Sequence, residues 1–118
     1  MAFRVEISPE ALGNLDAIAA HIQQHGSFES AQRWFNGIVI AIRSLAEMPS
    51  RCPLAGESDD LRTEVRLLLH GKRNRRYKVY YAIHHESQTI RVFHIRHWAR
   101  KPVEKSDLEE LEKRKPGR

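Results

Sequence analysis

The sequence is poor in several features that would place it in a specialised class of protein. Its 118 residues contain a single cysteine, Cys52, so no disulfide can form within the chain, and this is typical of a reducing compartment. No apolar run approaches the roughly 18 residues that cross a bilayer. The N-terminal residues MAFRVEISPE carry charges where a signal peptide requires an apolar segment. These absences predict a cytoplasmic protein with no membrane partner.

Acidic residues are almost missing from one third of the chain. Residues 62–101 contain eleven Lys or Arg but only Glu64 and Glu86, for a net charge of +9. Residues 1–61 carry −4 and residues 102–118 are neutral, so the whole formal charge of +5 comes from this stretch. Such a field favours a polyanion or an acidic protein as partner. The alternative is a solvated surface that keeps a small protein soluble.

The length of the chain predicts one domain, since domains contain roughly 100–200 residues. We place this domain at residues 1–102. Residues 103–118 form a charged tail in which Ser106 and Glu109 have the spacing of a capping box. The tail is therefore expected to form a short, frayed helix with little core of its own.

Alternation of apolar and polar residues predicts three strands in the basic stretch, at residues 63–69, 76–84 and 89–97. The third of these has apolar residues on both faces near its start, which favours an interior position in a sheet. The polar residues 85–88 join the last two strands into a hairpin.

The N-terminal region predicts a short strand followed by a helix. Apolar residues alternate with charged ones over residues 3–7. Ser8 and Pro9 then supply an N-cap and a first helical residue. Gly26 is typical of the position just after a helix end.

A second amphipathic helix is expected to begin after Ser27 or Ser30 and to run to about Glu47. Gly37 lies in its middle, where glycine costs ~1 kcal/mol relative to alanine. A close approach of the two helices would explain this glycine. The apolar stripe of each helix is interpreted as core.

The order of these elements predicts an α+β fold. An N-terminal strand and an antiparallel helical hairpin pack on a mostly antiparallel sheet, and the other face of the sheet is open and basic.

Four segments together resemble the RelE/ParE superfamily, the toxins of type II toxin–antitoxin systems. They are the helix start ISPEAxxxLDxI, the loop AEMPSRCPLAGE, the strand RRYKVYYAI and the ending RVFHIRHWARKP. The resemblance covers about residues 3–102 and implies the same fold, a role in growth inhibition and plasmid stabilization, and a cognate antitoxin that lies across the toxin. The basic stretch favours an acidic antitoxin.

The resemblance leaves the target of the toxin open. RelE-like members cleave messenger RNA, usually at the ribosome, whereas ParE-like members poison DNA gyrase without known catalysis. The basic sheet and the His97-Trp98 ending favour an endoribonuclease (mRNA interferase) that needs no metal. A ParE-like, non-enzymatic inhibitor of gyrase is the alternative, and a degenerate member that only binds its antitoxin is a third.

For RNA cleavage, the resemblance implies four catalytic residues. His97 would act as the acid or base, while Arg66, Lys78 and Arg100 would hold the phosphate. Nuclease members usually have Arg at the position of Lys78, so this residue keeps the charge but loses the planar fork. Glu64 is the weak candidate for a catalytic carboxylate.

Further residues are assigned to RNA binding on the same resemblance and on their charge. They are Lys72, Arg73, Arg75, Arg76, Arg96 and Trp98, the last of which would stack on a base. No cofactor is expected, and the histidines lack the Cys, Asp or Glu spacing of a metal site. ParE-like chains also end their sheet with a His and, three residues later, an Arg. A strand-end histidine with a structural hydrogen bond is therefore the alternative for His97.

Overall fold

A computed structural model describes residues 2–55 and 64–99 of the chain. The elements are β1 (Arg4–Ile7), α1 (Pro9–His25), α2 (Phe28–Ser44), β2 (Glu64–His70), β3 (Tyr77–His84) and β4 (Thr89–His97), with short 3-10 turns at Pro49–Arg51 and Arg73–Arg75. The predicted charged tail lies outside the described residues. No helix within them is long and apolar enough to cross a membrane.

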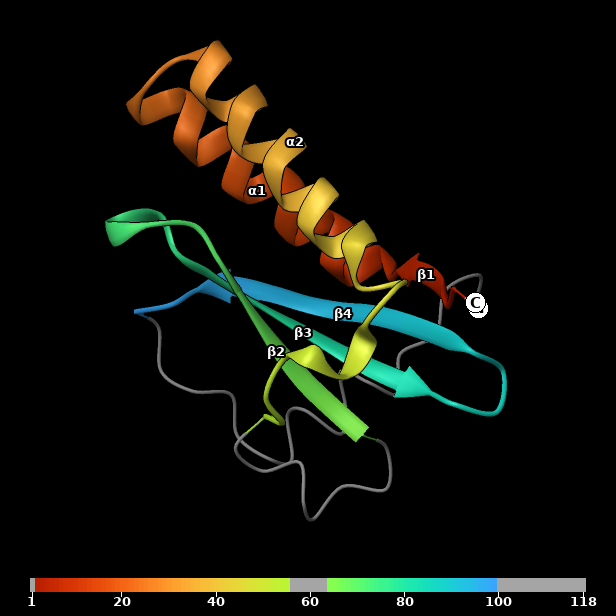
Figure 1. The fold of residues 1–118 in the computed structure, drawn as a ribbon. Coiled ribbons are helices and arrows are strands. Elements are labelled where there is room, and N and C mark those ends of the chain that lie inside the picture. Colours follow the sequence, from red (N-terminus) through yellow and green to blue (C-terminus); the bar gives the residue numbers. More distant parts are fainter. Residues whose placement is uncertain (1, 56–63, 100–118) are drawn as a thin grey trace.

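The four strands form one sheet in the order β1-β4-β3-β2. The strand β1 runs parallel to β4, and the other two pairs are antiparallel. The two helices lie side by side across one face of this sheet (Figure 1). The predicted α+β fold is therefore confirmed, and each observed strand begins within one residue of its predicted start.

Hydrogen bonds at the helix starts explain where the helices begin. Ser8 Oγ accepts the Ala11 N–H at 3.1 Å, which caps α1. At α2 the prediction left Ser27 and Ser30 open, and both take part: Ser27 Oγ accepts the Ser30 N–H while Ser30 Oγ accepts the Ser27 N–H, each at 3.0 Å. This reciprocal capping box fixes the turn between the two helices.

The end of α2 and the role of Gly37 differ from the predictions. The helix ends at Ser44 because Leu45 becomes its C-cap and donates to the Ile42 carbonyl, so residues 45–47 form turns instead of a further helical turn. Gly37 was predicted to allow close approach of the helices, and this was wrong. An added Cβ would have no atom of α1 within 4 Å, and its nearest neighbour, His70 Nε2 of β2, would lie at 3.6 Å, an ordinary van der Waals distance.

The main core lies between the helices and the sheet. The helices contribute apolar residues at helical spacing, and the sheet contributes one face of β3 and β4. The members with at most 1 % exposure include Leu15, Ile38, Ile42, Leu45, Val79, Tyr81, Ile90 and Val92. Burial of this continuous surface holds the hairpin on the sheet.

The face of the sheet opposite the helices has an apolar centre of its own. Val65, Tyr80, Ala82 and Phe93 are buried there in a second cluster, together with Ala55. The cations on this face therefore surround an apolar centre. The positive charge is concentrated toward one end of the sheet.

Candidate functional site

The candidate site lies at the end of the sheet where β3 begins and β4 ends. Tyr77 and His97 are cross-strand partners there, and their rings meet edge to face with centroids 5.2 Å apart. Trp34 of α2 also packs against Tyr77, with ring centroids 5.1 Å apart. The helical hairpin and the sheet therefore place an aromatic cluster beside the candidate acid or base.

The imidazole of His97 is held by the chain that follows it. The Ala99 N–H donates to His97 Nδ1 at 3.1 Å, so in the neutral ring the proton lies on Nε2. The ring of Trp98 follows with its centroid 6.2 Å from that of His97. This is the structural hydrogen bond expected of a strand-end histidine, and it also fixes the tautomer of the ring.

The phenol of Tyr77 stays protonated in this environment. Burial raises the pKa of Tyr77 above the ordinary value of a tyrosine, and the positive charge of Arg75 opposes only part of the shift. Tyr77 can therefore donate a hydrogen bond at neutral pH but does not supply a negative charge.

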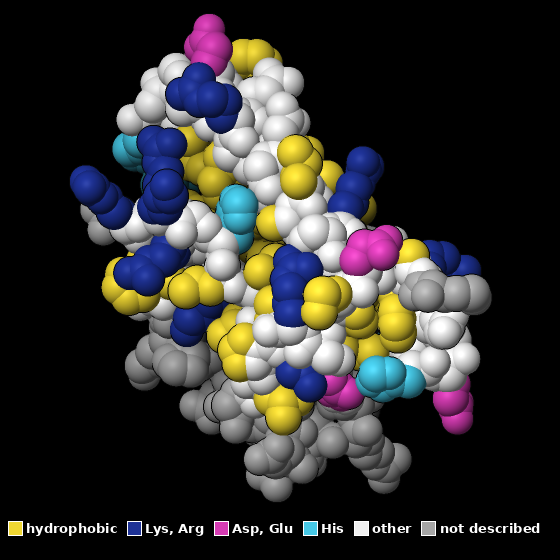
Figure 2. Space-filling view, viewed as in Figure 1, with side chains coloured by type: hydrophobic (Ala, Val, Ile, Leu, Met, Phe, Trp, Pro, Cys, Tyr) yellow, Lys and Arg dark blue, Asp and Glu magenta, His cyan; other side chains and the backbone are white. Residues whose placement is uncertain are grey.

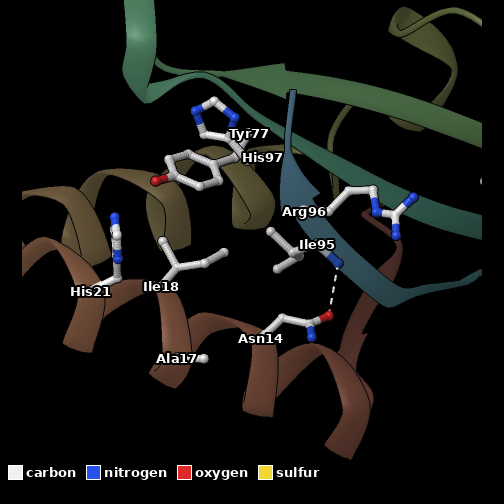
Figure 3. A pocket seen from close by; sticks show the side chains of 8 residues that line it. All are labelled: Asn14, Ala17, Ile18, His21, Tyr77, Ile95, Arg96 and His97. Carbon is white, nitrogen blue, oxygen red and sulfur yellow. Dashed lines mark hydrogen bonds between the residues drawn. The ribbon is translucent and has the colours of Figure 1, made fainter. Parts of the chain in front are cut away.

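A pocket of about 390 Å³ opens beside these residues, between α1 and the ends of β3 and β4. Asn14, Ala17, Ile18 and His21 line it from the helix, and Tyr77, Ile95, Arg96 and His97 line it from the sheet. Asn14 Oδ1 accepts the Ile95 N–H at 3.0 Å and so ties α1 to β4 (Figure 3). The side chain of Arg96 points away from the others in this view.

Arg66 lies far from His97. It pairs with Tyr81 across β2 and β3, four residues along the strand from Tyr77. With about 3.4 Å per residue and two strand spacings of about 4.8 Å each, the Cα atoms of Arg66 and His97 are on the order of 17 Å apart. The sequence predicted both as parts of one catalytic site, and the structure does not bring them together.

The guanidinium of Arg66 is instead engaged locally. Its Nε donates to Glu64 at 2.5 Å, and its Nη1 donates to the Cys52 carbonyl at 2.5 Å. Glu64 also lies 2.9 Å from His85 Nε2. Burial alone would raise the pKa of Glu64, but the hydrogen bonds and charges of His85 and Arg66 outweigh it and hold that pKa below its usual value. Glu64, the weak carboxylate candidate, thus belongs to a link between β2 and the β3–β4 hairpin.

Lys78 lies on the other face of the sheet from His97. Successive residues of a strand point to opposite faces, so Lys78 points away from the helices while Tyr77 packs under them. Its cross-strand partners are Arg96 on β4 and Leu69 on β2. Lys78 and Arg96 are therefore brought together, but without His97 or Arg66.

A β-bulge in β4 explains this separation. Tyr80 pairs with His94 and Tyr81 pairs with Val92, so Phe93 is an extra residue. Ile90 and Val92 face the helices before the bulge, and Ile95 does so after it. The extra residue reverses the alternation and turns His97 toward the helical side.

The remaining predicted contacts gather beyond the ends of β2 and β3. Lys72, Arg73, Arg75 and Arg76, which we call the basic turn, join these two strands. Figure 2 shows dark blue side chains on the side of the molecule where Figure 1 places this connection. The Arg76 guanidinium carbon lies 4.9 Å from the centroid of the Trp98 ring. The structure therefore groups four of the predicted RNA-binding cations with Trp98.

The remaining predicted catalytic residue, Arg100, lies outside the described residues. Within residues 2–55 and 64–99, no three His, Cys, Asp or Glu are placed to hold a metal ion. Sequence reasoning missed Asn14 and His21, since isolated polar residues on a helix give no signal of the strand they face.

Comparisons with known proteins agree with this architecture. A search of curated proteins by sequence found no match. Among solved structures, the free state of an arginine double mutant of the E. coli toxin RelE is similar, with a TM-score of 0.60 and 12% identity. The similarity covers 93% of this chain and 98% of that one, and it supports the fold.

The family comparison covers most of the domain. Residues 5–102 match the model of the ParE toxin of type II toxin–antitoxin systems, parDE. The match includes both helices and all of β2, β3 and β4, and membership implies an antitoxin as partner. The chain belongs to the ParE toxin family, within the RelE/ParE superfamily, and is the toxin of a type II toxin–antitoxin system.

Proposed function

We propose that this toxin arrests growth by binding DNA gyrase, as the ParE-like branch of the superfamily does, and that it does not cleave RNA. The observation that carries the proposal is the position of His97 relative to the cations. His97 and Lys78 point to opposite faces of the sheet, and the Cα atom of Arg66 lies on the order of 17 Å from that of His97.

RNA cleavage without a metal makes strict demands on geometry. One group must deprotonate the ribose 2′-OH, cations must stabilise the charged phosphorane, and another group must protonate the leaving oxygen. All of these must lie within hydrogen-bond reach of one phosphate. Lys78 and Arg96 form a pair on one face, but no acid or base of the predicted set lies beside them there. The arrangement therefore supports a binding surface better than a reaction centre.

The contacts of the candidate groups support the same conclusion. The hydrogen bond from Ala99 holds His97 as a strand-end residue, and Arg66 is held by Glu64 and Cys52. A cation that already has a carboxylate partner has less positive field to offer a phosphate. Both residues thus have structural roles that account for their presence in a protein without nuclease activity.

The antitoxin is proposed to be acidic where it contacts the toxin. The stretch from residue 62 to residue 101 carries eleven Lys or Arg against two acids, and complementary charge accelerates association. An acidic segment that covers the basic turn would neutralise this field. Gyrase and DNA are intracellular targets, so the proposal also places the toxin in the cytoplasm.

Two assays on the wild-type toxin and on His97→Ala test the proposed target. Purified toxin is expected to inhibit supercoiling by purified gyrase, and RNA 5′-end mapping after brief induction should show no new ends. His97→Ala should retain supercoiling inhibition within a few-fold, provided that its melting temperature shows a folded protein. New RNA ends that vanish in His97→Ala, with unaffected gyrase, would instead establish the nuclease.

Lys78 supplies a second comparison. A nuclease should lose activity in Lys78→Ala and gain it in Lys78→Arg, because Arg restores the planar fork that meets two phosphate oxygens. Under the gyrase proposal neither substitution creates or removes RNA ends. Expression of the wild-type toxin without an antitoxin should arrest growth, and normal colonies from a well-expressed soluble protein would contradict both activities.

A further inference from the structure

The basic turn is a charged surface with no ion-pair partner among the residues that the structure describes. Lys72, Arg73 and Arg75 are exposed and Arg76 is half-buried. Within the described part of the chain, none of the four lies within ion-pair distance of a carboxylate. The sequence from residue 65 to residue 85 contains no Asp or Glu. Four cations within five residues repel one another, and an anionic partner would relieve that repulsion.

The backbone of the turn is fixed in one shape. Gly71 has φ of 107°, and an added Cβ there would collide with the Arg75 carbonyl oxygen. Arg73 has φ of 56°, in the left-handed region that non-glycine residues seldom adopt. The Arg75 N–H donates to the Lys72 carbonyl at 3.0 Å and closes the turn. Such a conformation at an exposed cation is often functional.

Two of the arginines are also held in position. The guanidinium of Arg76 lies over one face of the Trp98 ring, 4.9 Å from its centroid. The Nη2 atom of Arg75 reaches the C-cap of α1, where a Cβ on Gly26 would lie 3.6 Å from it. The partial negative charge of a helix C-terminus favours a cation there. Both guanidinium groups therefore have a favourable contact within the toxin itself.

These features fit a phosphate backbone better than a peptide or a single strand. Arginine meets two phosphate oxygens with its planar fork, and duplex DNA carries one negative charge per ≈ 1.7 Å of axis. A peptide would need an apolar pocket beside the basic turn to anchor it. The pocket at α1 is not part of this surface, because none of the four residues of the basic turn lines it. A single strand is bound chiefly by base stacking, but one face of Trp98 is already occupied by Arg76.

We propose that the basic turn binds the phosphates of duplex DNA, so that the toxin contacts gyrase and its DNA together. The inference rests on the proposed function, because gyrase acts on duplex DNA. The turn supplies the contact through Lys72 and Arg73 at its tip, with Arg75 and Arg76 held behind them.

Binding of a labelled 30-base-pair DNA by full-length toxin, followed by fluorescence anisotropy at several salt concentrations, tests the proposal. The double variant Lys72→Gln/Arg73→Gln removes two exposed charges of the turn. Its matched control, Arg33→Gln/Arg43→Gln, removes two exposed charges from α2. Loss of two phosphate contacts should lower the salt slope by about 2 and weaken binding roughly 10- to 100-fold near 100 mM salt. The control should change binding less than about threefold.

Several results would overturn the inference. Equal weakening by both double variants would mean that the whole basic surface binds DNA. Binding of RNA or single-stranded DNA of the same length about tenfold more tightly than duplex would assign a different nucleic acid. Absence of duplex binding with retained binding to poly-glutamate would assign the turn to an acidic protein segment.

The supercoiling assay separates this inference from the proposed function. Suppose that Lys72→Gln/Arg73→Gln inhibits gyrase as strongly as the wild-type toxin does and binds DNA equally well. The inference then fails and the proposed function stands. If wild-type toxin leaves gyrase unaffected, the proposed function fails whatever DNA binding shows. Unchanged circular dichroism and melting temperature of both double variants establish that each is folded.

Discussion

Replacement of Arg66 by Ala distinguishes a structural role of this residue from a catalytic one. Arg66 donates to Glu64 and to the Cys52 carbonyl, each at 2.5 Å. The ion pair is largely shielded, with 19% of the Arg66 side chain and 27% of the Glu64 side chain exposed. The substitution leaves the Cys52 carbonyl without this donor, and it leaves Glu64 with His85 as its remaining side-chain partner among the described residues.

The expected cost follows from these contacts. A hydrogen bond that involves a charged group contributes about 1.5–3 kcal/mol, and partial exposure of the pair places its contribution at the low end. Loss of both bonds should therefore lower the free energy of unfolding by about 2–3 kcal/mol. For a domain of this size, each kcal/mol shifts the melting temperature by roughly 4 °C, so we expect a decrease of about 8–12 °C.

Thermal and urea unfolding followed by circular dichroism measure this cost. A double-mutant cycle with Glu64→Gln should give a coupling of about 1 kcal/mol between the two residues. Arg33→Ala, at an exposed position of α2, is the control and should change stability by less than about 0.5 kcal/mol. An unchanged melting temperature in Arg66→Ala would refute the structural role, and simultaneous loss of RNA cleavage would make Arg66 catalytic.

Three further predictions follow from the same structure. The pKa of Glu64 is lowered in the folded state, so its contribution to stability is present above about pH 4.5 and is lost as the pH falls through the folded-state pKa. Glu64→Gln should therefore lower the free energy of unfolding in urea more at pH 7 than at pH 3. Equal decreases at the two pH values would contradict this. Gly71→Ala should destabilise the fold by about 1–3 kcal/mol, whereas Arg73→Gly should stabilise it by up to ~1 kcal/mol through relief of the left-handed backbone; thermal unfolding of both variants is the measurement. The association rate with the co-purified antitoxin should fall between about 50 and about 500 mM salt, and stopped-flow rates independent of salt would exclude electrostatic steering.

Much of the fold was predictable because its signals are local. Ser8 and Pro9 specify a helix start by hydrogen bonding and backbone geometry within one turn. The alternation in β3 identifies the strand without knowledge of any neighbour. Gly37 was misread for the opposite reason. A glycine indicates that something lies close, but only the tertiary arrangement identifies that neighbour as His70.

The candidate site was less predictable because it depends on which residues meet across the sheet. The charge of the basic turn could be read from composition, and the structure groups those cations. In the link from Arg66 through Glu64 to His85, Glu64 and His85 are 21 positions apart, and no local pattern reports such a contact. Asn14 and Ile95 are 81 positions apart, so the pocket between α1 and β4 gives still less local signal.

The β-bulge at Phe93 explains why a nuclease site seemed consistent with the sequence. Strict alternation along β4 would place His97 on the face opposite Ile90 and Val92, which is also the face of Lys78. An acid or base and a cation would then lie on one surface.

The apolar residues on both faces of β4 were interpreted as a sign of an interior strand, which β4 is. They equally mark the position where the alternation reverses, because Phe93 and His94 both lie against Tyr80 on the same face. One inserted residue thus moves His97 under the helices, while Lys78 and Arg96 stay together on the opposite face, and that surface is suited to binding.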